Sequence, residues 1–122
     1  MRAFKTRHFQ RWARGAGVTD AALRKAIEEM AAGLIDADLG GGVVKKRVAL
    51  PGRGKSGGAR TIVATNRSGR WFFLFGYEKN VLDSISDKTL RVLQDTAADL
   101  LALDNDGLAQ AMNLGELQEI TP

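Results

Sequence analysis

Two segments of the chain carry apolar residues at the spacing of a buried helix face. The first follows Thr19, a residue type that caps helix N-termini, and predicts a helix over residues 20–33. The second follows Ser86, another capping type, and its apolar residues continue to Leu100 or Leu101. Two shorter helical pieces are predicted at His8–Arg14 and, with Asp106 as its cap, at residues 106–113.

Between the helical segments the pattern changes to that of strands. Strands are predicted at Arg2–Arg7, Val43–Leu50, Arg60–Asn66 and Arg70–Tyr77. The last of these is apolar on both faces and is expected at the centre of a sheet. Residues 66–69 predict a tight turn, whereas Pro51–Gly58 has almost no apolar content and predicts a loop. Helices, an antiparallel meander and further helices in this order predict one α+β domain.

Charge is distributed unevenly over these elements. Residues 39–77 contain eight of the 18 Lys and Arg residues and none of the 14 Asp and Glu residues. A basic segment with no acid to neutralise it indicates a polyanionic partner, and phosphate is the leading candidate. A solvated basic face that meets an acidic protein would leave the same signature.

The residue types disfavour several other kinds of site. The chain has no cysteine, and its one histidine, His8, lies far in sequence from any carboxylate cluster, so neither a metal site nor a serine triad is expected. Gly54-Lys55-Ser56 matches the end of a P-loop, but Ala49 stands at the position of the first glycine and a strand is predicted to follow. With no signal peptide and no stretch of about 18 apolar residues, we expect a cytoplasmic protein without membrane contact.

The basic residues that remain indicate cation chemistry on phosphate. The glycine-rich loop offers backbone N–H groups to an anion, and the strands on either side of it bring further cations to the same region if they pair. For Tyr77, packing in the core as a strand aromatic is as well supported as a role in the site. For the glycine-rich loop, the alternative to anion binding is a flexible connection between two strands. The candidate site residues are Lys45, Lys46, Arg47, Arg53, Lys55, Arg60, Arg70, Tyr77 and Lys79.

Several segments together resemble a known family. They are the string from Leu50 to Arg60 (LPGRGKSGGAR), the aromatic strand after it, Gly76–Asn80 and Ile85–Lys88. They resemble the RelE/HigB toxins of bacterial toxin–antitoxin pairs, and in particular the phage-associated HigB-like branch, which shares the Lys-Ser-Gly-Gly-x-Arg segment and the Lys-Asn pair. The similarity spans residues 1–103, so residues 104–122 are expected to be a C-terminal helical extension of the same domain.

The resemblance implies a RelE-like, microbial-RNase-like fold and a ribosome-dependent mRNA endoribonuclease that inhibits translation. Such an enzyme cuts messenger RNA in the ribosomal A site by driving the RNA's own 2′-hydroxyl onto the adjacent phosphate. It implies no metal and no cofactor. The implied partner is a cognate antitoxin, expected to be a helix-turn-helix repressor.

The resemblance also assigns roles by position. Arg60 corresponds to the family's phosphate-binding arginine, and Lys79 to an arginine of RelE that stabilises the transition state. Lys55, with Lys45 or Arg47, falls where the family has basic catalytic residues. Because arginine stays protonated, proton transfer is expected from a lysine or from Tyr77. Ile85 stands where RelE has a tyrosine, which leaves the general base unassigned.

Two further functions stay open at this point. A ParE-like relative would keep the fold and poison a topoisomerase, and a plain RNA- or DNA-binding module would use the cations without catalysis. A binding module loses RNA or DNA affinity with each cation removed, whereas a catalyst loses nearly all its activity when Arg60 alone is replaced. The acidic segment of residues 80–122 is either a solvated helical face, a shield over the basic patch or an antitoxin-docking segment.

Overall fold

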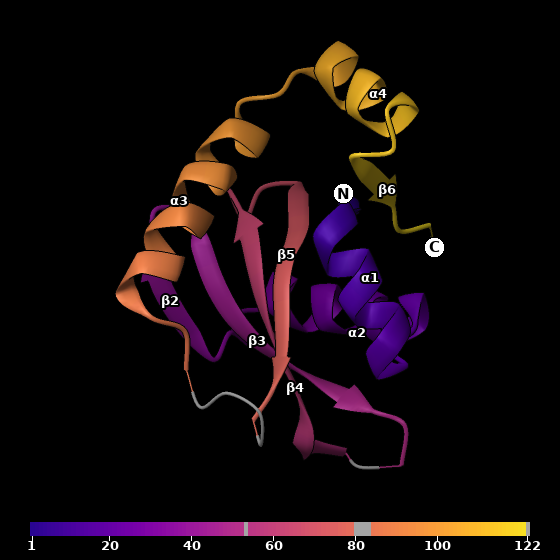
Figure 1. The fold of residues 1–122 in the computed structure, drawn as a ribbon, viewed down its shortest axis with the longest axis vertical. Coiled ribbons are helices and arrows are strands. Elements are labelled where there is room, and N and C mark those ends of the chain that lie inside the picture. Colours follow the sequence, from indigo (N-terminus) through magenta and orange to yellow (C-terminus); the bar gives the residue numbers. More distant parts are fainter. Residues whose placement is uncertain (53, 80–83, 122) are drawn as a thin grey trace.

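A computed structural model of the chain describes residues 1–52, 54–79 and 84–121, with the backbone alone described for residues 54–57 (Figure 1). The predicted α+β class is confirmed. The elements in chain order are β1 (Arg2–Thr6), α1 (Arg7–Ala16), α2 (Asp20–Ala31), β2 (Ala37–Gly40), β3 (Val43–Leu50), β4 (Gly54–Thr65), β5 (Arg70–Glu78), α3 (Asp87–Leu101), α4 (Asn105–Asn113) and β6 (Leu117–Glu119).

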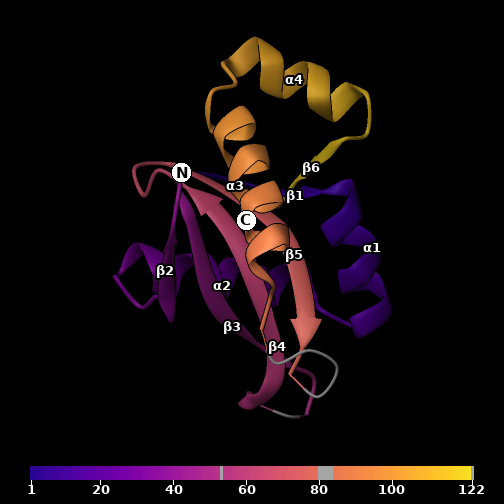
Figure 2. The same ribbon diagram turned by 60° about the vertical axis from the view of Figure 1, so that its left-hand side comes forward.

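The strands form one six-stranded sheet in the order β2-β3-β4-β5-β1-β6. Only β1 and β5 pair in parallel, and the other neighbours are antiparallel. Helices α1 and α2 lie against one face of the sheet and α3 against the other, with α4 beyond the end of α3 (Figures 1 and 2). The predicted meander β3–β4–β5 is therefore confirmed, and it forms half of a larger sheet.

Strand β5 supplies apolar side chains to two cores, one on each face of the sheet. Phe73 packs with the residues of α1 and α2, and Phe72 packs with those of α3 and α4. Both rings are fully buried. This arrangement explains why β5 is apolar on both faces and confirms its predicted central position.

The predicted caps of the two long helices are confirmed. The Thr19 hydroxyl accepts a hydrogen bond from the Ala22 amide, and the Ser86 hydroxyl accepts one from the Thr89 amide. For α4 the predicted cap was wrong. Asp104, rather than Asp106, accepts from the Gly107 amide, because the helix begins two residues earlier than its apolar spacing indicates.

The predicted loop Pro51–Gly58 was also wrong. Strand β4 begins at Gly54, which pairs with Leu50, so that only residues 51–53 connect β3 to β4. Backbone pairing continues along a hairpin whatever the side chains are, and it overrides the low strand propensity of glycine and lysine here. Gly52 adopts a φ of 75° in the turn, a left-handed conformation that favours glycine.

Two short strands at the sheet edges were not predicted. Strand β2 pairs with β3, and β6 pairs with β1. In consequence residues 104–122 contain an edge strand as well as a helix, and Leu108 and Leu117 are buried in the core that α3 covers. No helix in the described part of the chain has the length and apolarity that crossing a membrane requires.

Gly76 on β5 provides a test of how α1 packs on the sheet. A Cβ at this position would lie 2.3 Å from ring carbons of Trp12 on α1. We expect Gly76→Ala to lower the free energy of unfolding by about 2 kcal/mol, since the indole must move from a packed interface. Gly15→Ala is the matched control, because it lies in α1 with open space around it and should stabilise the protein by about 0.5–1 kcal/mol. Urea denaturation measures both, and equal effects would contradict this packing.

Candidate functional site

Three of the predicted site residues stand in one row across the sheet. Arg47 on β3 is in register with Arg60 on β4, and Arg60 is in register with Tyr77 on β5. Residues directly opposite each other on neighbouring strands point to the same face, so these side chains share the face on which α3 packs. We call Arg47, Arg60 and Tyr77 the cation row.

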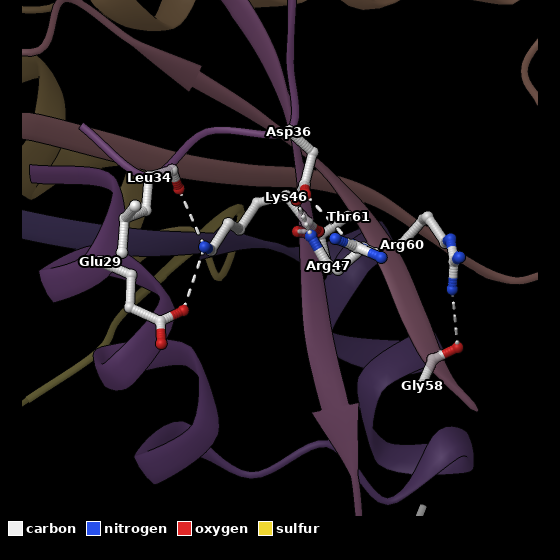
Figure 3. Close-up of polar contacts among 8 residues, drawn as sticks. All are labelled: Glu29, Leu34, Asp36, Lys46, Arg47, Gly58, Arg60 and Thr61. Atoms are coloured by element: carbon white, nitrogen blue, oxygen red, sulfur yellow. Dashed lines mark hydrogen bonds and ion pairs between the residues drawn. The ribbon is translucent and has the colours of Figure 1, made fainter. Parts of the chain in front are cut away.

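Arg60 occupies the middle of the cation row. Its half-buried guanidinium donates one long hydrogen bond, 3.4 Å, from Nη1 to the carbonyl of Gly58 (Figure 3). Within the described part of the chain no carboxylate pairs with it. A guanidinium held at one corner, with no other acceptor among the described residues, is suited to bind a phosphate in bidentate fashion.

Arg47 is held in place by an acid. One Asp36 oxygen accepts a hydrogen bond from the Arg47 backbone amide at 2.6 Å, and the other accepts from Nε at 3.1 Å (Figure 3). This pair fixes the guanidinium through Nε and leaves its terminal Nη groups directed elsewhere. Asp36 lies three residues before the segment 39–77 that contains no acid, so no local pattern indicates this contact.

Lys46 lies on the opposite face of β3 from its two neighbours. Its side chain is only 5% exposed, and Nζ pairs with Glu29 of α2 at 3.0 Å and donates to the carbonyl of Leu34 at 2.8 Å. The structure therefore does not bring Lys46 to the cation row, and an RNA contact by this residue stays a prediction.

Arg70 is also separated from the cation row. It stands at the start of β5, at the opposite end from Tyr77, and its guanidinium donates to the carbonyl of Leu103 and to Asn105 Oδ1. These bonds hold α4 to the sheet, and an RNA contact by Arg70 also stays a prediction. Since α4 lies at this end (Figure 1), it does not shield the cation row as one hypothesis for the acidic segment proposed.

Four predicted site residues remain: Lys45, Lys79, Lys55 and Arg53. Lys45 is half-buried and lies two residues before Arg47 on the same face, in register with Ile62. Lys79 is exposed and directly follows β5. Lys55 belongs to β4, but its side chain lies outside the described part of the chain, as does the whole of Arg53.

Tyr77 closes the cation row as a buried phenol. Burial raises its pKa above the usual value near 10, and the positive charge of Arg60 lowers it by a smaller amount. The hydroxyl is thus protonated at neutral pH. In this state it can donate a hydrogen bond or a proton, and it is not available as a general base without a change in its surroundings.

Two aromatic side chains extend from the cation row and were not predicted as site residues. The ring of Phe75 lies 6.1 Å from that of Tyr77, and the exposed imidazole of His8 stacks on Phe75 with centroids 5.6 Å apart and planes 7° apart. No sequence signal joins them, because α1 reaches β5 only in the folded chain.

The side chains of the cation row are of the types that suit an anion. Two guanidiniums and a phenol face one surface, while no group of three or more His, Asp or Glu residues within the described ranges could hold a metal ion. Two guanidiniums one strand apart match the charge of a phosphodiester and the negative charge that develops on it during transfer.

A comparison with protein families identifies related proteins. The model of a family described as "RelE toxin of RelE / RelB toxin-antitoxin system" matches residues 1–120. The match extends over β1 to β6, so it includes both the cation row and the C-terminal segment that follows residue 103. No curated protein matches the chain.

The phenol of Tyr77 can be titrated directly, because this is the only tyrosine in the chain. We expect the tyrosinate absorbance of the native protein to appear above pH 10, since burial raises the pKa of Tyr77. Arg60→Gln should move the midpoint higher still, because Arg60 lowers this pKa. An unchanged midpoint in Arg60→Gln would contradict the contact across the cation row.

The same shift has a consequence for stability. The folded protein holds the Tyr77 proton more tightly than the unfolded chain does, so this contribution is complete at neutral pH and is lost as the pH rises past about 10. We expect the free energy of unfolding of wild type to fall more steeply above pH 10 than that of Tyr77→Phe. Urea denaturation at pH 8 and at pH 10.5 measures the difference, and identical slopes would contradict burial of the phenol.

The ion pair between Lys46 and Glu29 is expected to be structural. Glu29→Gln leaves the buried ammonium with no carboxylate at 3.0 Å and should cost about 3 kcal/mol of unfolding free energy. The double variant Glu29→Leu/Lys46→Met, which removes both charges and keeps the packing, should cost much less. The control is Glu28→Gln, an exposed neighbour on α2, for which a change within about 0.5 kcal/mol is expected. An effect in Glu29→Gln no larger than in the control would disprove the role.

Proposed function

Because this chain belongs to the RelE family of toxins from toxin–antitoxin systems, we propose that it is an endoribonuclease that cuts messenger RNA in the ribosomal A site. The cation row is the observation that carries this proposal. It places Arg47, Arg60 and Tyr77 in register on one face of the sheet, where two positive charges and a protonated phenol meet. Membership of the HigB-like, phage-associated branch stays a prediction from the motif.

In the proposed reaction the RNA's 2′-hydroxyl attacks the adjacent phosphorus while the 5′-oxygen of the next nucleotide leaves. The products are a 2′,3′-cyclic phosphate and a 5′-hydroxyl. Arg60 and Arg47 bind the non-bridging oxygens, whose negative charge grows in the transition state. We propose that the Tyr77 hydroxyl, which is protonated at neutral pH, donates to a phosphate oxygen or to the leaving oxygen.

The proton of the attacking 2′-hydroxyl needs a separate acceptor. Lys45 lies on the same face as Arg47, and Lys79 follows directly after the strand that carries Tyr77. We propose that a lysine of this group, Lys55 included, accepts the proton. Because a lysine must first lose its own proton, the free protein should be a slow enzyme. The ribosome raises the cleavage rate by holding the 2′-hydroxyl in line with the phosphorus and the leaving oxygen.

The family also implies an antitoxin partner. We propose that it is a helix-turn-helix repressor that neutralises the toxin by presenting acidic side chains to the cation row. Arg60 has no carboxylate partner in the described part of the free chain, so a partner's acid would meet a charge that is ready to pair. Both ribosomes and such a repressor are encountered in the cytoplasm.

Primer extension on a messenger in a reconstituted translation reaction tests the proposal. Wild type should cut within codons only when ribosomes are present, and Arg60→Ala should reduce cutting at least 100-fold, because it removes the main phosphate contact. Arg60→Lys should fall between the two, since an ammonium keeps the charge but not the bidentate geometry. The matched control is Arg14→Ala, which removes an exposed arginine of α1 and should cut like wild type.

Other outcomes favour other functions. Intact message with all four proteins would contradict the proposal, and gyrase inhibition would then support the ParE-like function. If every arginine or lysine variant, Arg14→Ala included, lowered the RNA affinity by a similar factor, a non-catalytic binding module would be indicated.

A further inference from the structure

A groove of about 350 Å³ lies beside the cation row, between the start of α1, the middle of β5 and the first half of α3. Its floor is formed by Leu74 and Phe75, and its walls include His8 and Val92. Its volume is in the range of small-ligand sites, about 300–1,000 Å³. Figure 1 shows the three elements that surround it.

The aromatic rings connect this groove to the phosphate chemistry. Tyr77 belongs to the cation row, Phe75 lies 6.1 Å from it on the floor of the groove, and His8 stacks on Phe75 at the mouth. The imidazole is exposed, so its outer ring face is open to a further planar group. Val92 is 58% exposed on the opposite wall and offers an apolar surface at the same mouth.

We propose that this groove is a nucleobase subsite. A base of the RNA strand whose phosphate is bound by Arg60 stacks on the His8 ring, and Val92 covers its other side. The inference deepens the proposed function and rests on it. Single-stranded RNA is bound through bases stacked on aromatic side chains next to cations that hold the backbone, and this is the arrangement of the groove and the cation row.

The distribution of acids favours a nucleobase over a segment of protein. Among the residues that the structure describes, no acid lines this groove, so its described walls do not repel a phosphate chain. The next cavity along α3, of about 390 Å³, contains the carboxylates of Asp99 and Glu116 and is unfavourable for RNA. The hydroxyls of Thr89 and Thr96 lie on the α3 wall of the proposed subsite, where they can meet the polar edge of a base.

Fluorescence anisotropy with two short 2′-O-methyl oligonucleotides tests the subsite. One carries bases, and the other is abasic with the same number of phosphates, so neither is cut and both carry the same charge. Wild type should bind the first about tenfold more tightly, the effect of one base stacked on a ring. His8→Ala should reduce this ratio to about one and leave the affinity for the abasic strand unchanged. His8→Phe keeps a flat ring and should preserve the ratio.

Two controls separate the subsite from the phosphate contact. Gln10→Ala, a neutral change on the same helix and away from the groove lining, should behave as wild type. Arg60→Ala should weaken both oligonucleotides by the same factor. A ratio that His8→Ala leaves unchanged would overturn the proposal, as would an equal loss for both strands or no binding of either.

The outcomes also separate this inference from the proposed cleavage. If His8→Ala lowers the ratio of the two affinities but wild type leaves ribosome-bound message intact, the subsite is supported and the proposed cleavage is contradicted. If message is cut while His8→Ala leaves the ratio of affinities unchanged, the proposed cleavage is supported and the subsite is overturned. Loss of antitoxin binding in His8→Ala with an unchanged ratio would assign the groove to a protein segment instead.

Discussion

The hydrogen-bond register of β3, β4 and β5 is the constraint on which the site depends. Side chains alternate between the two faces of a strand, so a slip of one residue would exchange every inward and outward position. In the observed register Arg47, Arg60 and Tyr77 face one side, while Lys46 and Thr61 face the other. The buried Thr61 hydroxyl donates to the Lys46 carbonyl at 2.8 Å and adds a side-chain bond to this register.

Strand face and position along the strand divide the basic segment into two groups with different physical roles: Lys46 lies on the other face, and Arg70 at the other end of β5. Lys46 and Arg70 bond within the protein. Lys46 pairs with Glu29, and Arg70 donates to the residues at the start of α4. Arg60 donates to one acceptor, the Gly58 carbonyl, among the residues that the structure describes, and Arg47 is fixed by Asp36 through one side of its guanidinium. A net count of charge along the sequence therefore overstates the number of cations that a ligand can meet.

The sequence predicted those parts of the fold that local patterns determine. The caps Thr19 and Ser86, the strand Val43–Leu50 and the central position of β5 follow from residue type and spacing, and the structure confirms them. The extension of β4 to Gly54, the edge strands β2 and β6, and the parallel pairing of β1 were missed, because they depend on partners distant in sequence. For the candidate site, strand pairing was enough to anticipate that Arg47 and Arg60 meet. Helix packing, which brings His8 to Phe75 and Glu29 to Lys46, has no comparable local signal.

The central claim is that RNA phosphate binds at the cation row and not at the other basic residues. NMR of the arginine Nε–H groups, during titration with a short uncleavable 2′-O-methyl RNA, tests it most directly. We predict the largest shift for Arg60, a smaller one for Arg47, whose Nε–H is already donated to Asp36, and little change for Arg2 and Arg70, whose guanidiniums already pair with Glu119 and with Leu103 and Asn105. Shifts concentrated on Arg2 or Arg70, with Arg60 unmoved, would contradict the account.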